Sequence, residues 1–291
     1  MRLEPGRGGG TVGAVFESLP ITPRRAGLAV VAGLLIGVGG SPGDPIPQVD
    51  RFVPAKEVPD MTQNDPAGGF PAEGKMYCAP VAVSNSLMAL FGEDLEWEGV
   101  TQYDLVRQLA SVGYMNTHPK HGTHLNQLMR GVKRYVEERG VKDFKVRFQG
   151  CRIYERQFGP GPRRPGLGWI KAHLASGGAA WLLLGWYEYD PLTKEYKRIG
   201  AHWVTAVGFG VDEDGVADGE VLTGHDPAGP AGSKPQREYV RMRRLEEGTV
   251  VGAMKNQVFP ARGSYRMEGG MHVHSDADCA LLDGVVGLWI K

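Results

Sequence analysis

The hydrophobic pattern changes along the chain, and this change constrains the fold more than any other feature. Between residues 123 and 139, apolar side chains recur at the spacing of one helix face: Leu125, Leu128, Met129, Val132, Tyr135 and Val136. From residue 179 onward the apolar residues form continuous or alternating runs bounded by turn residues, which is typical of strands. Helices followed by strands, rather than alternating with them, predict an α+β fold.

The same patterns predict the individual elements. Helices are expected at residues 78–91 (with Gly92 as the stop signal), 101–110, 123–139 and 167–175. Pro80 fits the first turn of the first helix, because its missing N–H has no partner there. Strands are expected at 144–148, 179–189, 201–210 and 221–226, and an edge strand at 236–243. The later residues are weakly patterned and are expected to form a C-terminal extension.

The N-terminal part of the chain differs in composition from the rest. Arg24 and Arg25 precede an apolar run at residues 26–38, and small residues follow it. A basic flank before such a run is typical of a secretory signal, and the run is shorter than the ~20 residues of a spanning helix. We therefore predict an exported or membrane-anchored protein that contacts a membrane only through this segment. The predicted parts are a signal or anchor region (1–40), a proline-rich linker (41–57) and a folded domain (58–291).

Composition narrows the classes of function. The 33 lysines and arginines balance the 33 aspartates and glutamates, so the net charge is zero and nucleic-acid binding is not predicted. The three cysteines, Cys78, Cys151 and Cys279, lack the paired spacing of zinc sites. They fit either one reactive thiol with a Cys151–Cys279 disulfide or three independent thiols. No cofactor is predicted.

Cys78 has two interpretations. Because free cysteine is among the most frequently buried residue types, packing at the start of a helix is one of them. The other is chemical, since a helix N-terminus and a neighbouring imidazole both favour the thiolate, which is the nucleophilic form. Such a site also needs a base, a group that orients the base, and a donor for the oxyanion of the tetrahedral intermediate.

Candidates for these three roles are present in the sequence. His202 begins a predicted strand, on the same face as Val204, and we assign it as the base. Asp226 ends the following strand and could hold the imidazole tautomer if the two strands are antiparallel neighbours. Gln63, upstream of Cys78, could donate its amide N–H to the oxyanion together with the Cys78 backbone N–H.

A family resemblance is carried by four segments in order: MTQ, YCAPVAVSNSLMAL, AHWVTAVGFG and VLTGHDP. Together they resemble the papain-like cysteine peptidases of the bacteriocin-processing (double-glycine leader peptidase) type and their exported relatives. The resemblance covers roughly residues 58 to 230. It implies a papain-like fold, with a buried nucleophile helix packed on an antiparallel sheet. It also implies Cys78 as nucleophile, His202 as base, Asp226 as orienting residue and Gln63 as oxyanion donor.

The resulting hypothesis is that a Cys-His-Asp triad cleaves an amide bond in a peptide or protein substrate. Two features depart from the family's pattern: Ala79 stands where glycine is common, and Gln63 precedes Cys78 by fifteen positions, a longer gap than usual. Two alternatives use the same fold. One is acyl transfer to an amine, as in a transglutaminase, and the other is a catalytically silent module that binds peptides or cell-wall fragments. The oligomeric state is not predicted.

Other histidines and acidic clusters have simpler interpretations. The sequence around His118, His121 and His124 predicts a solvated loop rather than a metal site. The segment HVHSDADC (272–279) is richer in zinc-type ligands but has no separate ligand set. The acidic turn at 212–220 has its glycine too early for an EF-hand loop.

The sequence also predicts where the side chains of two further histidines lie. His225 is an alternative base, although its side chain should point to the opposite face from that of its neighbour Asp226. His173 is expected on the surface of a helix.

Overall fold

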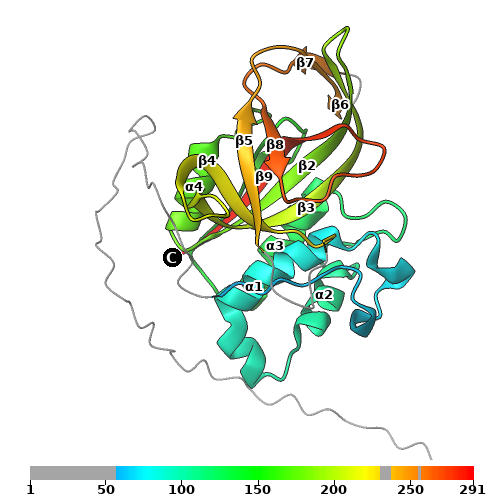
Figure 1. Ribbon diagram of the computed structural model, residues 1–291. Coiled ribbons are helices and arrows are strands. Elements are labelled where there is room, and N and C mark those ends of the chain that lie inside the picture. Colours follow the sequence, from blue (N-terminus) through cyan, green and yellow to red (C-terminus); the bar gives the residue numbers. More distant parts are fainter. Residues whose placement is uncertain (1–56, 230–236, 255–256) are drawn as a thin grey trace, which may run out of the picture. The chain divides into compact units, whose positions relative to one another are not determined.

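Helices precede most of the strands along the chain, so the predicted α+β class is confirmed (Figure 1). The helices are α1 (Cys78–Trp97), α2 (Gln102–Ala110), α3 (Leu125–Glu138) and α4 (Leu167–Ala175). The strands are β1 (Phe144–Gly150), β2 (Ala179–Asp190), β3 (Glu195–Val211), β4 (Ala217–His225), β5 (Glu238–Arg244), β6 (Thr249–Met254), β7 (Gln257–Pro260), β8 (Tyr265–Gly269) and β9 (Cys279–Ile290).

The computed structural model describes residues 57–229, 237–254 and 257–291, all within the unit Ile46–Lys291. The predicted signal or anchor region and nearly all of the predicted linker lie outside these residues. In the described part of the chain, no helix is long and apolar enough to cross a membrane.

Local signals explain where the helices begin and end. α2 starts with a capping box, in which Thr101 Oγ1 accepts the Asp104 backbone N–H and Asp104 Oδ2 accepts the Thr101 backbone N–H. α1 begins at Cys78, as predicted, but continues to Trp97. The prediction that Gly92 ends this helix is wrong, because Phe91 and Leu95 on either side of it are both buried in the core. Their burial outweighs the ~1 kcal/mol that glycine costs inside a helix.

Six strands close into a ring. β2 pairs with β3, β3 with β4, β4 with β5, β5 with β8, β8 with β9 and β9 with β2, and every pair is antiparallel. β1 extends the sheet from β9, and β6 pairs with β3 in parallel and carries β7. The sheet is therefore mixed rather than purely antiparallel. β5 was predicted as an edge strand, which is wrong, because the weakly patterned C-terminal residues supply β8 and β9 and close the ring beside it.

The two faces of the ring strands contribute to the two largest hydrophobic clusters. Leu182 and Val204 belong to one cluster with Leu174 of α4, whereas Leu183 and Trp203 belong to another with the buried faces of α1 and α3. Alternate residues of a strand point to opposite faces, so adjacent residues separate in this way. Figure 1 shows α1, α2 and α3 on one side of the strands, and α4 packs against β2, β3 and β9.

A buried polar network fixes α1 against β3. Thr205 Oγ1 donates to the backbone carbonyl of Ala82 at 2.7 Å, and Asn85 Nδ2 donates to Thr205 Oγ1 at 3.4 Å. These residues are buried, so the directional hydrogen bonds set the position of the helix along the strand. Cys78, one turn before Ala82, is therefore held at a fixed position relative to His202, three residues before Thr205.

His173 is buried, so the prediction that it lies on a helix surface is wrong. Its ring lies between the rings of Trp169 and Trp289, at centroid distances of 3.7 and 3.5 Å, and its Nδ1 is 2.9 Å from the Trp169 carbonyl oxygen. Burial lowers the pKa of His173 to about 4, so the ring is neutral at neutral pH. The surface of α4 at this point is covered by β9, whose position the sequence pattern did not predict.

Candidate active site

Cys78 is the first residue of α1 and is half-buried. The backbone N–H groups of Cys78 and Ala79 have no partner within the helix, because the first turn lacks preceding carbonyl groups, and Pro80 has no N–H. The N-terminus of a helix carries a partial positive charge that stabilises an anion, and a thiolate at Cys78 lies in this field.

His202 lies on β3, and its buried ring is bonded to one acidic partner. Its Nε2 is 2.6 Å from Asp226 Oδ1. Burial lowers the pKa of His202, but the Asp226 carboxylate and, to a lesser extent, the nearby Cys78 sulfur raise it to about 10. Because Asp226 occupies Nε2, Nδ1 is the ring nitrogen left for Cys78. Three of the residues singled out from the sequence are thus brought together.

Asp226 follows directly after β4, and both of its oxygens are hydrogen-bonded. Oδ1 accepts the backbone N–H of Ala228 at 2.9 Å in addition to His202, and Oδ2 accepts the backbone N–H of His272 at 2.7 Å. Burial raises the pKa of Asp226, but the His202 ring and these backbone N–H groups lower it overall. The carboxylate is therefore ionised at neutral pH and fixed in orientation.

The loop between Gln63 and Cys78 folds back on itself. Gln63 Nε2 donates to the Lys75 carbonyl at 3.1 Å, three residues before Cys78. Gly74 has a φ of 74°, and a Cβ there would lie 1.6 Å from the Gln63 carbonyl oxygen, so only glycine fits. The long gap in sequence therefore does not separate Gln63 from the residues that lead into α1. Gln63 is buried, and its Oε1 has no hydrogen-bond partner among the described residues.

The surroundings of the site include residues whose roles the sequence does not indicate. Trp186 of β2 stacks on the His202 ring, with centroids 5.6 Å apart and planes at 16°, and its Nε1 donates to the His272 carbonyl. Glu238 of β5 accepts the Asp226 backbone N–H at 3.0 Å. Trp186 is the one residue of this group that strand alternation could have indicated. It lies two residues after Leu184, the cross-strand partner of His202, so its side chain is on the same face of the sheet as that of His202. His272 and Glu238 depend on the closure of the ring, for which the sequence gives no signal.

The alternative base, His225, has different surroundings. Its Nδ1 is 3.6 Å from Asp60 Oδ2, and both side chains are buried. The imidazole that interacts with both Cys78 and Asp226 is that of His202. The assignment of His202 rather than His225 as the base stays a prediction, and His202 is the imidazole bonded to Asp226.

Cys151 and Cys279 are free thiols, and no disulfide joins them. Burial raises the pKa of each to about 11. Both therefore stay protonated, and poorly nucleophilic, at neutral pH. Of the two arrangements that the sequence allowed, the structure has three separate thiols.

The His-rich and acidic segments considered as metal sites in the sequence have other surroundings in the structure. In the described residues, no group of three or more His, Cys, Asp or Glu side chains is arranged to hold a metal ion. His118 and His121 stack on each other, with ring centroids 4.6 Å apart. The HVHSDADC segment lies in the loop between β8 and β9 except for Cys279, which begins β9, and the backbone N–H of His272 in this loop donates to Asp226.

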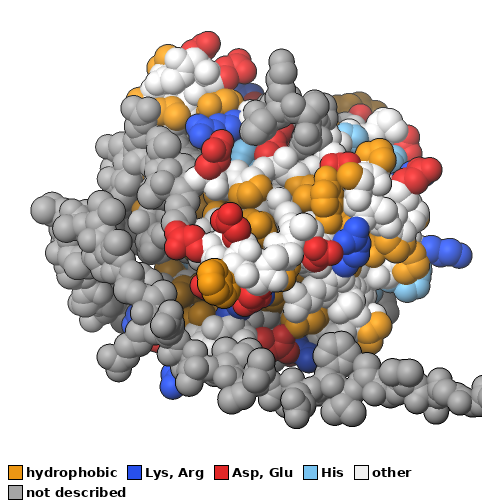
Figure 2. All heavy atoms as spheres, turned by 90° about the horizontal axis from the view of Figure 1, so that it is seen from below, with side chains coloured by type: hydrophobic (Ala, Val, Ile, Leu, Met, Phe, Trp, Pro, Cys, Tyr) orange, Lys and Arg blue, Asp and Glu red, His pale blue; other side chains and the backbone are white. Residues whose placement is uncertain are grey.

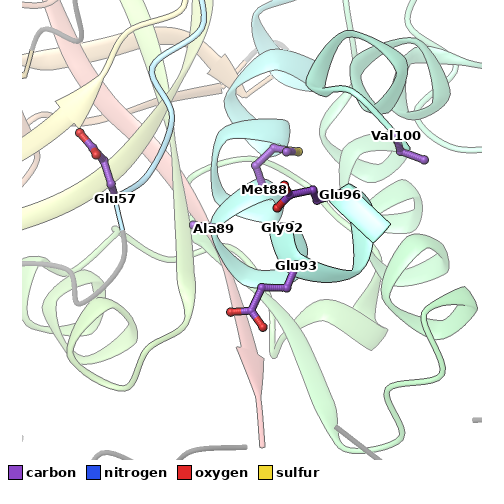
Figure 3. A pocket seen from close by; sticks show the side chains of 7 residues that line it. All are labelled: Glu57, Met88, Ala89, Gly92, Glu93, Glu96 and Val100. Atoms are coloured by element: carbon purple, nitrogen blue, oxygen red, sulfur yellow. The ribbon is translucent and has the colours of Figure 1, made fainter. Parts of the chain in front are cut away.

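A separate hollow of about 500 Å³ lies along the later turns of α1 (Figure 3). It is lined by Glu57, Met88, Ala89, Gly92, Glu93, Glu96 and Val100. Figure 2, which views the molecule from below, shows acidic and hydrophobic side chains close together on that face. The lining contains no nucleophile and no imidazole, so this hollow is distinct from the candidate active site at the start of the helix.

No protein-family model matches the chain, and no curated protein sequence is significantly similar to it. The function is therefore inferred from the residues of the site.

Proposed function

We propose that this protein is a cysteine peptidase, a thiol hydrolase of peptide or amide bonds with a papain-like fold. The observation that carries the proposal is the contact of one buried imidazole, that of His202, with both the Cys78 sulfur and the Asp226 carboxylate. A helix that presents a thiol to an imidazole and a carboxylate on an adjoining sheet also supports the papain-like fold. The exported or anchored location predicted from residues 26–38 stays a prediction.

The proposed mechanism begins with an ion pair. In this pair the raised pKa of His202 keeps a proton on its ring, and a positively charged imidazole beside the sulfur favours the nucleophilic thiolate form of a cysteine. The sulfur attacks the substrate carbonyl carbon, and the carbonyl electron pair moves to its oxygen. The resulting oxyanion accepts hydrogen bonds from the Cys78 backbone N–H and from the amide N–H of Gln63 that Lys75 does not use.

Collapse of this intermediate releases the first product. His202 gives its proton to the leaving nitrogen as the carbon–nitrogen bond breaks, and the acyl group remains on Cys78 as a thioester. The now neutral ring then removes a proton from a water molecule that attacks the thioester carbon. The acid product leaves, and the thiolate and the protonated imidazole are restored. Asp226 holds the ring through both steps.

The two alternatives differ from this proposal in what happens after, or instead of, thiolate attack. In an acyl transferase, an amine rather than water would attack the thioester. A silent binding module would have no need of an ion pair between Cys78 and His202, so the contact between these residues favours an enzyme.

A peptide mixture tests the proposal. We expect the protein at pH 7 to generate new peptide termini, detected by mass spectrometry, and alkylation of the protein with iodoacetamide beforehand should abolish them. A matched reaction with an added primary amine measures acyl transfer, which would appear as amine-capped products. If no peptide changes, or if cleavage survives alkylation, the peptidase proposal is wrong.

A further inference from the structure

Glu238 is a buried acid directly behind the proposed triad. It is the first residue of β5, it pairs with Gly224 of β4, and the residue is 3% exposed. Its Oε2 accepts the backbone N–H of Asp226. Glu238 therefore holds the backbone of the residue whose side chain orients His202.

The charges around Glu238 are mainly negative. Burial and the nearby carboxylates of Asp60 and Asp226 raise the pKa of Glu238 to about 8, against the lowering effect of the Asp226 backbone N–H. The imidazoles in this region already face other carboxylates, since His202 is bonded to Asp226 and His225 lies beside Asp60. At neutral pH Glu238 is consequently a neutral carboxylic acid.

We propose that Glu238 is a positioning residue that, in its protonated form, holds the turn carrying Asp226 and thereby sets the upper pH limit of catalysis. This inference rests on the proposed function of the site. Loss of the proton places a third carboxylate beside Asp60 and Asp226. Repulsion among the three displaces the Asp226 turn, and the hydrogen bond that orients His202 is weakened.

The direction of the pH effect follows from the proton balance. Glu238 binds its proton more tightly in the folded protein than in the unfolded chain, where its pKa is the ordinary value of a glutamate. Its contribution to stability is therefore complete below about pH 4.5 and is lost as the pH rises toward about 8. Activity should decline above the same value.

The Glu238→Gln substitution tests this inference, because the amide keeps an oxygen for the Asp226 N–H and cannot ionise. We expect wild-type kcat/KM to fall about tenfold between pH 7 and pH 9, as one proton is lost, and that of Glu238→Gln to change less than about threefold. Glu268→Gln, the same change on neighbouring β8, is the control and should follow the wild type. Superimposable profiles of wild type and Glu238→Gln would overturn the inference.

Thermal unfolding separates this inference from the proposed function. The Tm of Glu238→Gln relative to wild type should rise from pH 5 to pH 9, whether or not the protein hydrolyses peptides. If neither variant hydrolyses any peptide but this Tm difference appears, the proposed function fails while the ionisation of Glu238 stands. A Tm difference that does not change with pH would refute the proposed ionisation of Glu238.

Discussion

Replacement of Cys78 by alanine is expected to lower peptide hydrolysis by at least about 10³-fold, because the mechanism has no other nucleophile. The substitution should be mild for the fold. Cys78 is half-buried at the first position of α1, alanine is a strong helix former, and the buried contacts that hold the helix come from later residues such as Ala82. Product formation from a cleaved peptide, measured with wild type and variant at equal concentration, gives the ratio.

Cys151→Ala is the matched control for this experiment. Cys151 is also half-buried, but its raised pKa makes it a poor nucleophile, so its removal should leave hydrolysis within about twofold of wild type. Far-ultraviolet circular dichroism should be the same for wild type and both variants. Hydrolysis by Cys78→Ala within tenfold of the wild-type rate would show that the thiol is not the nucleophile.

The second large effect is expected from Asp226→Asn, which should lower kcat/KM by about a hundredfold or more. The Asp226 carboxylate is a major reason that the pKa of buried His202 lies near 10. Without its negative charge, burial dominates and the pKa of His202 falls, so the ring loses its proton at neutral pH and no longer stabilises a thiolate. The amide also brings its N–H₂ against one of the backbone donors, Ala228 or His272, that the carboxylate accepts.

The pH profile distinguishes this loss of charge from general damage. In Asp226→Asn, the remaining activity should have its optimum at lower pH than that of wild type, because His202 is protonated only there. Asp212→Asn, at an exposed turn after β3, makes the same change in charge and should keep the wild-type profile. A loss of less than threefold in Asp226→Asn would mean that Asp226 does not orient the base.

Much of the site could be predicted from the sequence because its parts depend on local signals. Cys78 opens α1 as the proline and the apolar pattern indicate, and His202 and Asp226 come together because β3 and β4 are consecutive antiparallel strands. Short-range pairing of this kind follows from strand pattern and turn position. The position of Gln63 beside Lys75 was not predictable, since it depends on how the loop between them folds.

The other missed features at and behind the site depend on contacts between distant parts of the chain. The burial of His173, the inner position of β5 and the support of Asp226 by His272 and Glu238 require β8 and β9 to close the ring. Those strands carry little alternation, because much of β9 is buried on both faces, and a continuous apolar run does not specify its partners.

The central claim, that His202 holds Cys78 as a thiolate, is tested most directly by the pH dependence of Cys78 alkylation. Wild type and His202→Ala would be treated with iodoacetamide from pH 5 to pH 9, and the modified cysteine identified by peptide mass spectrometry. The ion pair predicts that the wild-type rate at Cys78 changes little between pH 5 and pH 8. In His202→Ala, the rate should instead rise about tenfold per pH unit up to the ~8.5 of an ordinary thiol. The same steep rise in the wild type would contradict the proposed mechanism.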